Sequence, residues 1–128
     1  MNQRQILIID DEPDIREIAK LSLQLTKKWD VLTAASGADG IALATQEQPD
    51  AILLDLLMPE MDGLATLKQL NSNPRTQQIP VVLLTATVKL AIQDDYVQLG
   101  AKGTLIKPFD PGILGDQIEQ VLGWVALT

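Results

Sequence analysis

Residues 51–63 read AILLDLLMPEMDG, an apolar run that leads into one carboxylate, Asp55, and then into a proline and an Asp-Gly pair. A short apolar run bounded by turn signals is typical of a buried strand. A strand that is apolar on both faces belongs in a parallel sheet covered by helices on both sides. Because ligands of such sheets bind beyond the carboxyl ends of the strands, Asp55 is a candidate reactive group.

The rest of the chain repeats this alternation of apolar strands and amphipathic helices. Short connections between alternating elements predict one α/β domain, a doubly wound parallel sheet of five strands with five helices. The expected strands are 6–9, 31–34, 51–54, 81–84 and 104–106. The expected helices are about 13–27, one around 41–45, one around 64–70, 88–99, and a last one capped by Asp110 with Pro111 in its first turn.

Composition excludes several classes of function. A length of 128 residues fits a single domain, and we expect no output domain within residues 1–128. The net charge of −7 argues against direct nucleic-acid binding, which needs a basic surface. The chain has no cysteine and no histidine, so metal or acid–base chemistry must use carboxylates, lysine, tyrosine or backbone. No apolar run is long enough for membrane insertion and no signal peptide is evident, so a cytoplasmic location is expected.

Polar side chains follow four of the five expected strands. Asp10 and Asp11 follow the first, Asp55 the third, Thr85 the fourth and Lys107 the fifth. In a parallel sheet these ends meet at one edge. Mg²⁺ would relieve the repulsion among three carboxylates, since it prefers oxygen ligands and phosphate oxygens. Asp55 could then be a nucleophile toward phosphorus, with a hydroxyl and an ammonium group to hold the transferred anion.

Four motifs at these strand ends resemble the response regulator receiver domain of two-component signalling. They are IIDDE at 8–12, LDLLMP at 54–59 with the Asp-Gly pair, LTA at 84–86 and IKPF at 106–109. The chain is most similar to a stand-alone receiver of the chemotaxis-regulator type. This resemblance implies a flavodoxin-like fold with strand order 2-1-3-4-5, and a cis bond before Pro108.

The resemblance also implies a phosphorelay role for each site residue. Asp55 would accept a phosphoryl group from a histidine kinase or a histidine phosphotransfer protein, and the aspartyl phosphate would later hydrolyse. Asp11 would bind Mg²⁺ directly and Asp10 through water, with Asp55 and the backbone carbonyl of Leu57 as further ligands. Such a phosphoprotein is a signalling switch rather than an enzyme with a small-molecule substrate.

The remaining implied contacts concern the phosphoryl group and the output. Thr85 would hydrogen-bond the phosphoryl group and Lys107 would pair with it. An output protein would bind the face made by the fourth helix, fifth strand and fifth helix. Thr104 stands where the family commonly has the Tyr or Phe that moves on activation. Trp124 begins an apolar tail that should pack on the domain or else serve a homodimer or partner.

Two other functions stay open on the sequence alone. One is a phosphorylation-independent, receiver-like adaptor, which would bind its partner equally well without an acceptor carboxylate. The other is an aspartyl-phosphate phosphatase of the haloacid dehalogenase type, which uses the same residue types with Mg²⁺. Such phosphatases normally carry a second acid two residues after the nucleophile, where this chain has Leu57.

Overall fold

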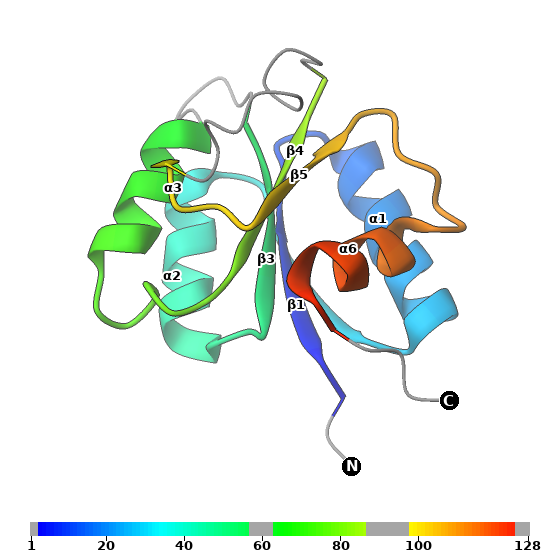
Figure 1. Ribbon diagram of the computed structural model, residues 1–128, viewed down its shortest axis with the longest axis horizontal. Helices are drawn as coiled ribbons and strands as arrows, with labels where there is room; N and C mark the ends of the chain where they lie inside the picture. Colours follow the sequence, from blue (N-terminus) through cyan, green and yellow to red (C-terminus); the bar gives the residue numbers. More distant parts are fainter. Residues whose placement is uncertain (1–2, 57–62, 87–97, 125–128) are drawn as a thin grey trace.

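The computed structural model describes residues 3–56, 63–86 and 98–124. Five parallel strands form one sheet in the order β2-β1-β3-β4-β5, which confirms the expected fold (Figure 1). The strands are β1 (Gln5–Ile9), β2 (Asp30–Ala34), β3 (Ala51–Asp55), β4 (Val81–Thr85) and β5 (Gly103–Ile106). The helices in the described residues are α1 (Pro13–Lys27), α2 (Gly37–Glu47), α3 (Gly63–Ser72) and α6 (Leu114–Leu122).

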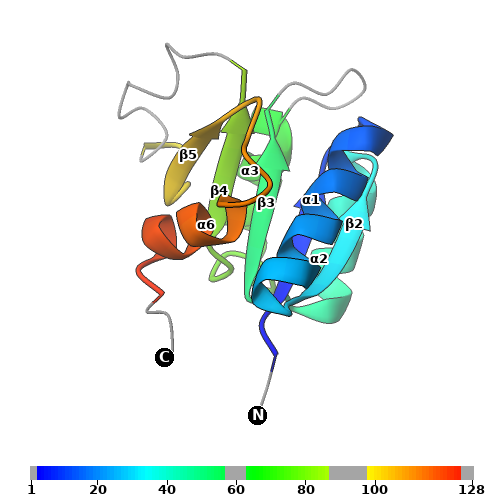
Figure 2. The ribbon, with the colours of Figure 1, turned by 90° about the vertical axis from the view of Figure 1, so that its right-hand side faces the viewer.

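Helices cover both faces of the sheet. Helices α2 and α3 lie on one face and α1 and α6 on the other, as the two views show (Figures 1 and 2). Strand β3 is buried along its whole length, with Leu53 in the core under α1 and α6 and Leu54 in the core under α2 and α3. Full burial of each such side chain stabilises the fold by about 1.5–3 kcal/mol. Strand β3 is apolar without interruption because its side chains point alternately into two cores, one on each face of the sheet.

Helix α1 is tied to the C-terminal part of the chain by polar contacts. Lys27 Nζ lies 2.5 Å from a carboxylate oxygen of Asp116 and 2.6 Å from one of Glu119, both on α6. The Ser22 hydroxyl donates a hydrogen bond to the carbonyl oxygen of Pro111. The hydrogen bonds that Lys27 donates to Asp116 and Glu119, the first being the larger influence, raise the pKa of Lys27 above its ordinary value.

The last helix begins later than the sequence predicts. The expected cap at Asp110 is wrong, because α6 starts at Leu114 and its N-cap is Ile113. The Asp110 carboxylate instead accepts a hydrogen bond from Gly112 N at 2.8 Å, and its carbonyl accepts one from Ile113 N at 3.1 Å. An aspartate that bonds to the backbone two residues on favours a turn, which here precedes the helix.

Three other expectations concern the second half of the chain. Most of the expected helix 88–99 lies outside the described residues, although Gly100 has the positive φ, 93°, typical of a residue after a helix end. The Lys107-Pro108 bond is cis, as expected. Trp124 packs on the domain, edge to face with Trp29 and with the Arg4 guanidinium 3.9 Å from its ring centre.

None of the helices in the described part of the chain has both the length and the apolar composition needed to cross a membrane.

Candidate functional site

The strand order brings the predicted site residues to one edge of the sheet. Strand β3 lies between β1 and β4, and β4 lies between β3 and β5. Asp55 and Thr85 are the last residues of β3 and β4, while Asp10 and Lys107 directly follow β1 and β5. The backbone also couples neighbouring ends, since Lys107 N donates to the carbonyl oxygen of Thr85 at 2.8 Å.

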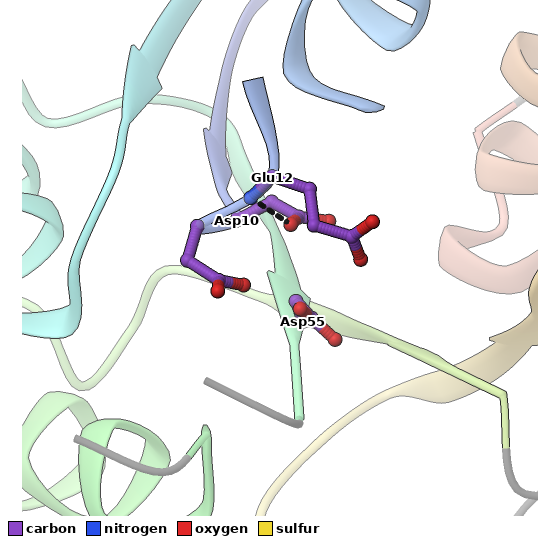
Figure 3. Close-up of side chains that lie close together, drawn as sticks. Asp10, Glu12 and Asp55 are labelled. Atoms are coloured by element: carbon purple, nitrogen blue, oxygen red, sulfur yellow. Dashed lines mark hydrogen bonds between the residues drawn. The ribbon is translucent and has the colours of Figure 1, made fainter. Parts of the chain in front are cut away.

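Four carboxylates form a cluster at this edge. One oxygen from each of Asp10, Asp11, Glu12 and Asp55 lies within 4.8 Å of the others. Figure 3 shows Asp10, Glu12 and Asp55 turned toward the same space, although they come from the loop after β1 and from the end of β3. The sequence motif contained Glu12 without a role for it. Its place directly after two site aspartates was the one signal that could have suggested a role.

Lys107 is the cation of the cluster. Its Nζ lies 3.2 Å from Asp10 Oδ2, 3.1 Å from Glu12 Oε1 and 3.3 Å from Asp55 Oδ2. Burial lowers the pKa of Lys107 and is the largest single influence on it. The hydrogen bond to Glu12 and the charges of Asp10 and Asp55 outweigh burial, so the pKa is raised above its ordinary value. Lys107 is therefore charged near neutral pH and can bind an anion.

The inner part of the site is closed to water. Asp10, Asp55 and Thr85 are exposed by only 1%, 2% and 1%. Buried charge is costly unless it is paired, and one lysine cannot balance four carboxylates. The cluster thus carries excess negative charge, which is typical of a site built to receive a cation.

Oxygen atoms of the right kind for such a cation are present. Asp10 Oδ2 and Asp11 Oδ1 are buried and accept no hydrogen bond from any described residue, although Asp10 Oδ2 is in the ion pair with Lys107. Carboxylate oxygens are the ligands that Mg²⁺ prefers, usually one or two together with water and phosphate oxygens. The donor set therefore fits Mg²⁺. The carbonyl of Leu57, expected to be a further ligand, lies outside the described residues.

The chain near the end of β3 is packed closely against Gly63. Gly63 lies against the backbone after β3: a Cβ there would be 2.5 Å from the Asp55 carbonyl oxygen and 2.4 Å from Leu56 Cα. Its φ is not in the left-handed region, so the glycine of the Asp-Gly pair permits close approach rather than an unusual turn. On β5, the hydroxyl oxygen of Thr104 is buried and bonds to no described residue.

Sequence comparisons identify relatives of this chain. The family described as "Response regulator receiver domain" matches residues 6–119. Protein PilH of Pseudomonas aeruginosa is 39% identical over 119 residues, which are 92% of this chain and 97% of PilH. The DNA-binding dual master transcriptional regulator RpaA of Synechocystis sp. is 42% identical over 106 residues, 83% of this chain. The chain matches only 44% of the length of RpaA.

Structure comparisons agree with this family. The chemotaxis response regulator CheY4 of Vibrio cholerae has a TM-score of 0.85 and 29% identity, covering 94% of this chain and 99% of that one. The receiver domain of the sensor histidine kinase PA1611 from Pseudomonas aeruginosa has a TM-score of 0.81 and 26% identity, covering 95% of this chain and 99% of that one. That receiver has a magnesium ion coordinated in its active-site cleft.

The strand-end site and the comparisons lead to one family. Receiver domains are phospho-accepting signalling switches that bind Mg²⁺ in an acidic site and interact with histidine kinases and output partners. The acidic cluster described above is the corresponding feature of this chain. The chain therefore belongs to the response regulator receiver domain family of two-component signalling.

Proposed function

We propose that Asp55 is the residue that accepts the phosphoryl group. The observation that carries this proposal is the position of its carboxylate at the end of β3, buried and 3.3 Å from Lys107 Nζ. A carboxylate oxygen of Asp55 would attack phosphorus while the phosphorus–nitrogen bond of a phosphohistidine donor breaks. Water would later cleave the aspartyl phosphate and regenerate the carboxylate.

The other site residues would hold the ion and the transferred group. Asp10, Asp11, Asp55 and the carbonyl of Leu57 would bind Mg²⁺, which when bound neutralises charge on the phosphoryl oxygens. Lys107 would exchange a carboxylate partner for a phosphoryl oxygen.

Thr85 lies at the end of the neighbouring strand β4, and its hydroxyl would donate a hydrogen bond to the phosphoryl group. Its backbone link to Lys107 N gives a route by which movement at β4 reaches β5.

We further propose that residues 1–128 form a single receiver domain and that no output domain lies within these residues. The match to nearly the whole of PilH supports this proposal, whereas RpaA is more than twice as long as the segment it shares. The phosphodonor would be a histidine kinase or a phosphotransfer protein. Output would pass through the face that includes β5, where Ile106 is 42% exposed. The proposed receiver would not bind nucleic acid directly, insert into a membrane or turn over a small-molecule substrate. A cytoplasmic location stays a prediction, and a homodimer is left open.

Intact-mass measurement tests the proposal. The protein is incubated with acetyl phosphate, with Mg²⁺ or with a chelator, alongside Asp55→Asn and a matched control, Asp39→Asn, at an exposed position of α2. We expect a Mg²⁺-dependent gain of one phosphoryl group in the wild type and the control, and none in Asp55→Asn. No gain in the wild type with either this donor or a phosphohistidine donor would overturn the proposal and favour the phosphorylation-independent adaptor. Hydrolysis of a phosphomonoester with turnover would favour the phosphatase.

A further inference from the structure

Arg16 contacts the loop that carries the acidic residues. It lies in the second turn of α1, and its side chain is partly buried. Its Nη1 donates a hydrogen bond to the backbone carbonyl oxygen of Asp10 at 2.8 Å. Neither the strand-end pattern nor the acidic motif pointed to this residue, because the contact joins a helix side chain to a backbone atom six positions earlier.

The hydrogen bond from Arg16 completes a set of contacts that hold Asp10 in place. Asp10 N donates to the carbonyl oxygen of Ala34 on β2 at 3.1 Å. Asp10 Oδ1 accepts a hydrogen bond from Glu12 N at 2.9 Å. With its carbonyl bound by Arg16, Asp10 has one polar atom that accepts no hydrogen bond among the described residues, Oδ2, which faces the acidic cluster and is held only by the ion pair with Lys107 at 3.2 Å.

The same bond orients Asp11. The carbonyl of Asp10 belongs to the planar peptide group that joins Asp10 to Asp11. Fixing the direction of that carbonyl fixes the peptide plane, and hence the direction in which Asp11 leaves the backbone. No described residue donates a hydrogen bond to Asp11 Oδ1, so its position depends on this backbone rather than on a partner of its own.

The start of α1 has no side-chain cap that could fix the direction of the Asp10-Asp11 peptide group. Its N-cap residue is Glu12, which makes no side-chain capping hydrogen bond. The carboxylate of Glu12 is instead 3.1 Å from Lys107 Nζ. Arg16 therefore supplies a side-chain hydrogen bond to this loop from the helix itself.

We propose that Arg16 is a positioning residue for the divalent-cation site, acting through the Asp10-Asp11 peptide group. This inference rests on the proposed Mg²⁺ site. Groups that orient metal ligands typically change metal affinity by about 10–100-fold when they are removed. Replacement of Arg16 by methionine, which keeps the helix propensity and most of the aliphatic stem, should weaken Mg²⁺ binding by roughly tenfold or more.

Simple electrostatics predicts the opposite sign. Removal of a positive charge beside an acidic cluster should strengthen cation binding. A weaker affinity in Arg16→Met therefore cannot come from the lost charge. Lys20→Met is the matched control, because Lys20 is one turn further along α1, is also partly buried and has no hydrogen bond or ion pair with the acidic loop in the described structure.

Calorimetric titration with Mg²⁺ alone, at fixed ionic strength, compares the wild type, Arg16→Met, Arg16→Lys and Lys20→Met. Urea unfolding in chelator shows whether each variant is folded. If Arg16→Met does not fold, the comparison is made with Arg16→Lys. We expect both Arg16 variants to bind Mg²⁺ more weakly than the wild type, and Lys20→Met to bind it equally or slightly more tightly. Equal or tighter binding in the folded Arg16 variants would overturn the role of Arg16 alone. Absence of Mg²⁺ binding by the wild type would overturn the metal site itself, and this inference with it.

Discussion

Replacing Asp11 with asparagine should stabilise the metal-free protein. Asp11 contributes to the crowding of four carboxylates but has no ion pair with Lys107, unlike Asp10, Glu12 and Asp55. The substitution therefore removes repulsion and sacrifices little attraction within the described structure. A site that exists to bind a cation should be a source of instability when the cation is absent.

The magnitude follows from the distances. At 4.8 Å or less, each pair of like charges costs at least about 0.9 kcal/mol in a medium as polar as water, and about 3.5 kcal/mol at an effective permittivity of 20. Asp11 faces three other carboxylates and one lysine, so roughly two pairs remain uncompensated. Even with screening as strong as that of bulk water, Asp11→Asn should raise the free energy of unfolding by about 2 kcal/mol.

Mg²⁺ should remove this advantage. At one hundred times its dissociation constant, a ligand of the native state adds about 2.7 kcal/mol to the stability of the wild type, which is more than the advantage of about 2 kcal/mol. Urea unfolding in chelator and in Mg²⁺ measures both effects, and Glu17→Gln, at an exposed position of α1, controls for the change in net charge. If Asp11→Asn is less stable than the wild type in chelator, the electrostatic reasoning about this cluster is wrong.

Three further predictions test particular contacts. Gly63→Ala should lower the free energy of unfolding by about 2–3 kcal/mol, because its Cβ would overlap the backbone of Leu56; unchanged urea unfolding would contradict that overlap. Glu12→Gln should speed phosphorylation by acetyl phosphate at saturating Mg²⁺, because it frees Lys107 from a competing carboxylate. An equal or slower rate of phosphorylation, measured in samples quenched at successive times, would refute this competition. The raised pKa of Lys27 means that its ion pairs stabilise the fold below the unfolded-state pKa and stop doing so as pH rises through the folded-state value. The stability difference between wild type and Lys27→Met should thus be constant from about pH 6 to 9 and shrink above about pH 10.4, as urea unfolding across pH would show.

The sequence was sufficient to place the strand-end residues. Asp55 follows a short apolar run, bounded by turn signals, that is typical of a two-sided buried strand, and parallel strands bring their carboxyl ends together whatever the details of packing. The position of Asp10, Thr85 and Lys107 at the same edge follows from that topology. The apolar pattern of each segment and the parallel fold require the same strands at these positions. The observed strand order therefore confirms the predicted sheet.

Contacts that depend on side-chain direction could not be predicted in this way. The link from Glu12 to Lys107 joins residues 95 positions apart, and no periodicity encodes it. The last helix was placed too early because Asp110 has two favourable uses, as a helix cap or in a turn, and only the packed structure decides between them. Arg16 likewise looks like an ordinary helix cation until its backbone partner is seen.

The central claim is that Asp55 carries the phosphoryl group. The most direct measurement is borohydride reduction of the phosphorylated protein followed by peptide mapping, because reduction converts an aspartyl phosphate to homoserine at the modified position. The account predicts homoserine at residue 55 only, formed in Mg²⁺ and absent in chelator. Homoserine at residue 10 or 11, or a stable phosphoester at Thr85, would contradict it.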